Sequence, residues 1–335
     1  MRPLAQGWPT RSLVAGGAAW AGCAALAMIC DTYWLTTLTS AFCLAIACSG
    51  VAVLYGRLGL VNLCQYALVG IGGWTALRIH FAIEPGFGVA VLAGGLVAAA
   101  VGVVCTLPVL RLRGLILALA TLMIAGGLQV VIAATGFPDG GAGLLGHASG
   151  TGRTMMQRPA IATSDAAYFL LVATVLIGCF LLIELHVRGR PGRTWSTMRR
   201  DERLAQSLGV NVVAYRLWGV ALSGFLAGVG GALLAGSVGS LDGRMFGAAQ
   251  SILLFALAVV GGVDSWVGAV AAGLLLRAMP SLLANMGLSG FVAMIVFGIG
   301  LMQALTTAPD GIAGSLSRLG QRSLRRWPKR QRFPT

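Results

Sequence analysis

The chain has 335 residues, of which 57% are apolar and only 10% are charged, and its mean hydropathy is +0.85. Soluble domains carry about 25% charged residues, so this composition excludes a water-soluble fold of this length. The formal net charge of +14 would indicate a nucleic-acid partner in a soluble protein. Here the arginines stand at the ends of apolar runs, where they orient a membrane protein, and we expect no nucleic-acid partner.

The apolar runs are long and continuous, which predicts transmembrane helices rather than the short alternating strands of a barrel. Ten runs have about the length of a span: 13–31, 35–55, 60–83, 86–108, 114–135, 165–187, 212–238, 247–263, 265–284 and 288–307. The first run could instead be a secretory signal peptide. We interpret it as a first span because many further spans follow.

The basic residues divide unequally between the two sides of the membrane. If the N-terminus is cytoplasmic, most of the 24 lysines and arginines lie in cytoplasmic segments, as the positive-inside rule requires. The sequence thus predicts an all-α polytopic membrane protein with about ten transmembrane helices and both termini cytoplasmic.

This topology divides the chain into five parts. They are a cytoplasmic N-terminus (1–12), six transmembrane helices with an external loop at 136–164 (13–187), a cytoplasmic loop (188–211), four transmembrane helices (212–307) and a basic cytoplasmic tail (308–335). The external loop is either a connector or a contact for an outside partner. The tail is expected to lie on anionic lipid headgroups.

The cytoplasmic loop at 188–211 is the only long polar stretch between spans that is also densely charged. Its pattern predicts one helix over Thr194–Leu208, with Pro191-Gly192 before it and Gly209 as its stop. One side of that helix would carry Trp195, Met198, Ala205 and Leu208. Such a helix either docks in a groove of a partner or lies on the membrane surface, and the pattern alone favours neither.

The chain shows no constellation that predicts catalysis. It has no HExxH, no GxSxG and no two carboxylates close together on one span, and its three histidines are too scattered for a metal site. A phosphate-binding loop needs GxxxxGK[ST], but the sole lysine is Lys329 in the tail. We therefore expect a transport subunit that is not an enzyme and holds no cofactor or metal, with ATP bound by partner subunits.

Small residues are frequent within the spans. The sequence Gly224-Phe-Leu-Ala-Gly228 is a GxxxG motif, and 49 residues of the chain are glycine. Close helix packing is the favoured interpretation, and broken helices that line a cavity are the alternative. The seven cysteines all lie in or beside apolar runs, which favours small buried side chains over disulfides or metal ligands.

Residues 192–216, GRTWSTMRRDERLAQSLGVNVVAYR, resemble the loop of the branched-chain amino acid ABC transporter permeases, the LivH/LivM family. LRLRGLILALATLM (110–123) and VVGGVDSWVGAVAAG (259–273) are similar to further motifs of that family, and the chain is LivM-like. The resemblance implies a type II importer fold of two inverted halves. It also implies a second permease subunit, two cytoplasmic ATPases, a periplasmic or extracellular solute-binding protein, and a place in the bacterial inner membrane among its lipids.

The resemblance assigns ATPase coupling to the cytoplasmic loop. The candidate coupling residues are Gly192, Arg193, Trp195, Arg199, Arg200, Glu202, Ala205, Leu208 and Gly209. Polar or amphipathic side chains within apolar spans are candidates for the substrate pathway, or alternatively for hydrogen bonds between helices. They are Asn62, Gln65, Trp74, Thr121 and Gln129.

The cargo implied is a branched-chain or other hydrophobic amino acid. Asn62 and Cys64 stand where the family has Ser and Gly, and Trp74 stands where it has Tyr. These departures leave the cargo open, so urea, short amides, a sugar or another small solute are alternatives within the same machinery. A secondary transporter or channel that works alone, and a membrane scaffold with degenerate transport parts, are alternatives of another class.

Overall fold

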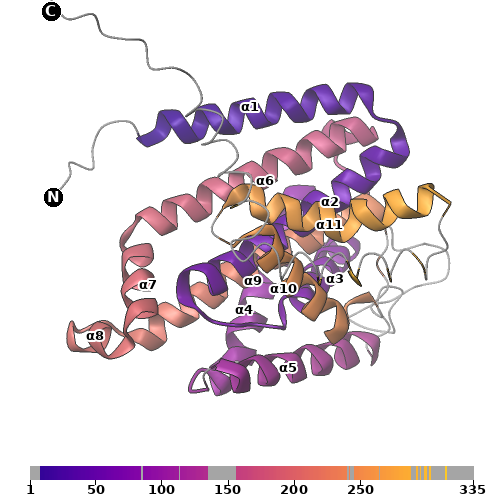
Figure 1. The fold of residues 1–335 in the computed structure, drawn as a ribbon. Helices are drawn as coiled ribbons and strands as arrows, with labels where there is room; N and C mark the ends of the chain where they lie inside the picture. Colours follow the sequence, from indigo (N-terminus) through magenta and orange to yellow (C-terminus); the bar gives the residue numbers. More distant parts are fainter. Residues whose placement is uncertain are drawn as a thin grey trace, which may run out of the picture.

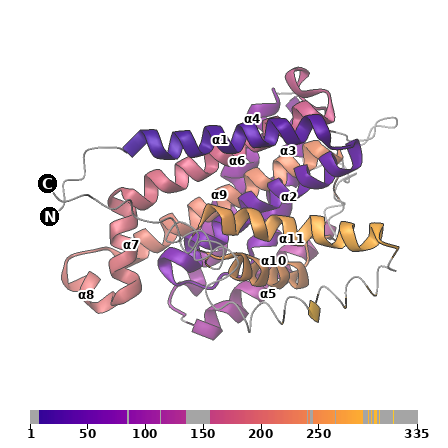
Figure 2. The ribbon, with the colours of Figure 1, turned by 45° about the horizontal axis from the view of Figure 1, so that its top comes forward.

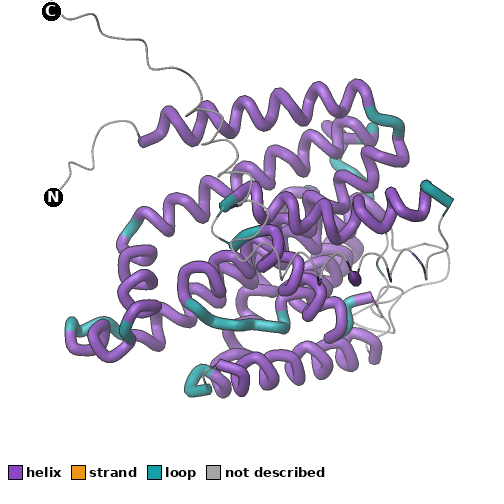
Figure 3. The backbone as a smooth tube through the Cα atoms, in the orientation of Figure 1, coloured by secondary structure: helices purple, strands orange, loops and turns teal. Residues whose placement is uncertain are grey.

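The structure, a computed structural model, describes residues 8–83, 86–112, 114–134, 156–239, 241, 245–263 and 265–287, and single positions up to 314. These residues form helices and the loops between them, and no strand occurs in this part of the chain (Figures 1 and 3). The long helices are α1 Trp8–Ile29, α2 Thr32–Val51, α3 Gln65–Ile83, α4 Phe87–Thr106, α5 Gly114–Ala134, α6 Asp165–Arg188, α9 Val212–Val238, α10 Ala248–Gly261 and α11 Trp266–Asn285.

Shorter helices join these long ones. They are the π-helix η1 Ala52–Leu58, the 3₁₀ helices η2 Leu107–Val109 and η3 Ala160–Ala162, and the α-helices α7 Arg190–Arg200 and α8 Glu202–Ser207. The π-helix continues α2 without a break. As Figure 2 shows, α7 and α8 project together from one end of the bundle.

Six helical stretches within the described residues are long and apolar enough to cross a membrane: Thr32–Leu58, Phe87–Val109, Gly114–Ile132, Asp165–Arg188, Val212–Val238 and Trp266–Leu283. The apolar stretches Val14–Ile29 and Ala248–Gly261 are shorter. The chain is thus a multi-pass membrane protein. Most of the run 288–307, most of the loop 136–164 and nearly all of the tail 308–335 fall outside the described residues.

The span expected at 60–83 begins later than predicted, at Gln65. The preceding helix ends at Gly59, whose φ of 70° is left-handed and favours glycine. The Gly59 amide donates to the Tyr55 carbonyl oxygen at 3.2 Å, and the Leu60 amide to the Leu54 carbonyl oxygen at 3.1 Å. These bonds close the helix end, and the chain runs unwound to Gln65.

Helix α9 forms the centre of the bundle and packs most extensively against α2, α3 and α4 (Figures 1 and 2). Its glycines permit this approach. A Cβ atom on Gly228 would lie 2.5 Å from the Gly94 carbonyl oxygen, and one on Gly224 would lie 3.0 Å from the Ala98 carbonyl oxygen. The packing interpretation of this GxxxG motif is therefore confirmed.

The cysteines are all free, and four of them, Cys43, Cys48, Cys64 and Cys179, are buried. Burial of these four agrees with the expectation that they serve as small apolar side chains. Most other buried side chains are aliphatic or aromatic, and Tyr168, Phe169 and Phe246 are among the largest of them. Tyr168 satisfies its hydroxyl by donating to the Leu233 carbonyl oxygen at 2.6 Å, which ties α6 to α9.

Candidate coupling unit and polar sites within the spans

The predicted single helix over Thr194–Leu208 is wrong, because the loop forms two helices, α7 and α8. Asp201 separates them with an extended backbone (φ −155°, ψ 115°). Its carboxylate accepts hydrogen bonds from the Arg203 amide at 2.8 Å and the Leu204 amide at 3.3 Å. Aspartate is a preferred N-cap, so a new helix starts after Asp201, whereas the apolar pattern alone predicts one continuous helix.

Two glycines lie near the ends of the coupling unit, which we define as residues 190–208, comprising α7, α8 and the C-cap residue Leu208. Gly192 lies against the Val187 backbone at the end of α6, where a side chain would collide with main-chain atoms. Gly209 has φ 78°, and the Val210 amide donates to the Ala205 carbonyl oxygen at 3.1 Å beside it. The predicted stop at Gly209 is confirmed. Both glycines shape the connections of the unit.

The inner face of the unit is packed against the chain itself. Trp195 is fully buried, and its indole Nε1 donates to the Tyr215 carbonyl oxygen at the start of α9 at 3.0 Å. Met198 and Ala205 are also buried. These three side chains are therefore covered within the chain and offer a partner no apolar surface, and the part of Trp195 and Ala205 in coupling stays a prediction.

Arg199 connects the unit to the second membrane helix. Its Nη1 donates to the carbonyl oxygen of Gly56, which lies in the π-helix η1. The two residues are 143 positions apart. Gly56 was not predicted as part of the site, and no local pattern in the sequence could have found it, since only the folded chain brings it to α7.

Glu202 and Arg216 connect the unit to two further elements. The Arg216 Nη2 donates to the Glu202 Oε2 at 2.9 Å, and its Nη1 donates to the Leu110 carbonyl oxygen at 3.2 Å. The two side chains are only 13% and 18% exposed. A single arginine thus joins α8, α9 and the turn after α4, and Glu202 holds the unit in place from within.

The outer face of the unit carries charged and apolar side chains together. Arg193, Arg200 and Arg203 are exposed. Leu204 and Leu208, one turn apart, are 51% and 68% exposed. Exposed leucines beside arginines suit both roles predicted for this loop, docking on a protein and lying on a membrane surface. Leu204 and Arg203 were not among the predicted coupling residues. Leu204 stands four residues before Leu208, a helical spacing that could have placed both leucines on one face.

Asn62 and Thr121 come together beside the unwound stretch before α3. The Thr121 hydroxyl accepts a hydrogen bond from the Leu63 amide at 3.0 Å, and Asn62 Oδ1 accepts one from the Cys64 amide at 3.0 Å. Both residues line a small cavity that also meets Thr106 and Arg216. Both oxygens therefore accept from main-chain amides of the unwound stretch. The Thr121 bond joins α5 to this stretch, whereas the Asn62 bond is local and does not join two helices.

Gln65 makes a polar contact deep between α2, α3 and α9. Its Nε2 donates to the Ser223 carbonyl oxygen at 2.9 Å, and its Oε1 accepts from the Ser223 hydroxyl at 3.0 Å. Only 1% of Gln65 is exposed. The side chain is fully engaged in joining helices, so it again fits the hydrogen-bond alternative.

Trp74 and Gln129 lie apart from these three residues. The ring of Trp74 has the Arg78 guanidinium 6.0 Å from its centroid. The Gln129 amide lies beside Gly247, where α5 meets the start of α10. The structure therefore does not bring the five predicted pathway residues into one cluster.

Two comparisons with known proteins identify the family. The model of the family "branched-chain amino acid transport system / permease component" matches residues 33–305. The chain is 30% identical over 246 residues to the high-affinity branched-chain amino acid transport system permease protein LivM of Salmonella typhimurium. It is also 30% identical over 250 residues to LivM of Escherichia coli.

Each match covers 68% of this chain and 58% of the relative, so the chain spans less than two thirds of the curated relatives it matches. No solved structure gives a significant match. The motifs at 192–216 and 259–273 lie within the matched region. The chain therefore belongs to the permease family of the branched-chain amino acid transport systems.

Proposed function

We propose that this chain is the transmembrane permease subunit of an ABC importer for branched-chain or other hydrophobic amino acids. The similarity to the LivM proteins over 68% of the chain supports the cargo. The observation that supports the mechanism is the set of hydrogen bonds that join the coupling unit to the membrane helices. The unit is bonded to η1 by Arg199, to α9 by Trp195, and to the turn after α4 through Arg216.

These bonds suit the transfer of force from a partner. A push on α7 or α8 reaches α2 through its π-helical end, and it reaches α9 at the centre of the bundle directly. Two cytoplasmic ATPases would supply that push, and a second permease subunit would complete the path. A solute-binding protein on the outer side would deliver the amino acid. The chain would alternate access to a path between its spans and those of the second subunit.

Reconstitution tests this function. Vesicles holding this chain, its second permease and the two ATPases should accumulate radiolabelled leucine when the binding protein is outside and ATP is inside. Uptake should stop when either ATP or the ATPases are omitted. Concentrative uptake by the chain alone would show a stand-alone transporter instead. Competition by urea or short amides, with none by leucine or valine, would replace the proposed cargo.

We further propose ten spans with both termini on the cytoplasmic side of a bacterial inner membrane. The arginine distribution supports this topology, since the coupling unit, the segment 1–12 and the tail then share one side. A reporter fused after Thr335 should be active only in the cytoplasm, and a reporter inserted at Gly150 only outside. Opposite activity at either position would contradict the topology.

A further inference from the structure

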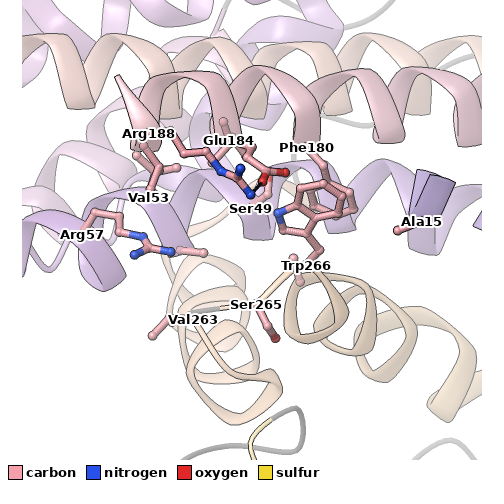
Figure 4. Close-up of a pocket in the computed structure, with 14 residues that line it drawn as sticks. Ala15, Ser49, Val53, Arg57, Phe180, Glu184, Arg188, Val263, Ser265 and Trp266 are labelled. Carbon is pink, nitrogen blue, oxygen red and sulfur yellow. Dashed lines mark ion pairs between the residues drawn. The ribbon is translucent and has the colours of Figure 1, made fainter. Parts of the chain in front are cut away.

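A pocket of about 440 Å³ lies beside the coupling unit, between α1, the end of α2, α6 and the start of α11. Figure 4 shows the side chains that line it. Arg57, Ile183 and Trp266 are each partly exposed, so the pocket opens to the outside of the described bundle. None of the residues proposed for the substrate pathway or for coupling lines it.

Two arginines that stand at the ends of candidate membrane spans line one end of the pocket. Arg57 is the penultimate residue of the span Thr32–Leu58, and Arg188 is the last residue of the span Asp165–Arg188. Arg188 pairs with Glu184 one turn before it, and its side chain is 50% exposed. The described lining therefore carries two guanidinium groups against one carboxylate.

Arg57 is the cation of the pocket that is available to a ligand. It makes no hydrogen bond or ion pair with the described part of the chain. The carbonyl oxygen of its neighbour Gly56 accepts a hydrogen bond from Arg199. A half-buried guanidinium at the edge of apolar helices is poorly solvated, and a planar donor of this kind binds phosphate oxygens in a bidentate manner.

The walls away from the arginines are apolar and aromatic. The rings of Phe180 and Trp266 are stacked, with centroids 5.4 Å apart and planes 11° apart. Phe180 lies two turns before Arg188 on α6, which places it about 12 Å deeper along the helix. The pocket thus has a cationic end at headgroup level and an apolar wall at the level of acyl chains.

We propose that this pocket binds an anionic phospholipid, with its phosphate on Arg57 and Arg188 and an acyl chain along Phe180 and Trp266. Basic pockets between helices at a membrane boundary have the chemistry that recognises acidic headgroups. The bound lipid would fill the space between α1, η1 and α6. This site needs the chain to lie in a membrane, but it does not depend on the cargo or on the ATPases.

The test uses the full chain alone, purified in detergent and stripped of lipid. Thermal unfolding is followed while phosphatidylglycerol or phosphatidylcholine is added. Phosphatidylglycerol should raise the unfolding temperature more than phosphatidylcholine does. Arg57→Gln should weaken the apparent phosphatidylglycerol affinity about five-fold, as loss of one interfacial cation predicts. Arg111→Gln is the matched control, an exposed arginine in the turn after α4, and should not change it.

A second measurement on the unchanged protein keeps the proposal testable if Arg57→Gln does not fold. A photoactivatable phosphatidylglycerol with its reactive group in an acyl chain should label peptides that contain Phe180 or Trp266. Equal binding of both lipids, equal loss with Arg111→Gln, or label elsewhere on the chain would overturn the site. The same stabilisation by inorganic phosphate alone would show that a free anion, and not a lipid, is recognised.

Discussion

At the residue scale, the charged side chains of the loop divide into those that bond within the chain and those that are exposed. Glu202 and Arg216 form a mostly buried pair, and Arg199 is bonded to a main-chain oxygen of η1. The residue type alone could not separate these roles. Arg199 and Arg200 are neighbours of equal charge, but only Arg199 has a described partner. Motif and charge singled out the loop, while the inward or outward direction of each side chain required the fold.

This assignment predicts a stability effect for Glu202→Ala. The substitution removes the carboxylate that pairs with Arg216 and leaves that half-buried guanidinium short of an acceptor. The free energy of unfolding should fall by about 1–3 kcal/mol. Thermal unfolding in detergent measures the loss, and Arg203→Ala on the exposed face of α8 is the control. Equal unfolding temperatures for Glu202→Ala and the unchanged protein would remove Glu202 from its structural role.

At the element scale, apolar runs predicted the spanning helices closely. The run 212–238 coincides with α9, and the run 165–187 ends one residue before α6 does. The observed helices differ from the predicted ones where a polar side chain or a left-handed residue ends or starts a helix within the predicted range. Asp201 divides the predicted loop helix by capping α8, and Gly59 ends the second span and delays α3. The π-helix η1 has no signature in hydropathy.

The five candidate pathway residues show the same limit. Each was chosen as a polar or aromatic side chain within an apolar run, and that choice correctly found buried polar groups such as Gln65 and Thr121. Whether such a group faces a path or joins two helices depends on packing. In this fold Gln65 meets Ser223, a residue 158 positions away, which no local pattern reveals.

At the scale of the whole molecule, the coupling unit and the central helix form one connected body. Trp195 and Arg216 join the unit to α9, and the glycines of α9 allow close contact with α4. Closely packed helices move together, because their interiors resist compression. A displacement of α7 and α8 is therefore transmitted to the middle of the bundle. The proposed ATP-driven movement depends on a partner that binds the exposed face with Leu204 and Leu208.

We propose that partner ATPases drive the permease through the exposed face of the coupling unit. ATP-driven leucine uptake should therefore be measured in the reconstituted assembly with Leu204→Asp and Leu208→Asp combined. An unpaired carboxylate buried at each docking position should lower uptake at least about ten-fold, while the unfolding temperature of the chain stays unchanged. Gln206→Asp adds one carboxylate about 200° around α8 from Leu204, and it should leave uptake near the original rate. Undiminished uptake by the doubly substituted protein would contradict the account.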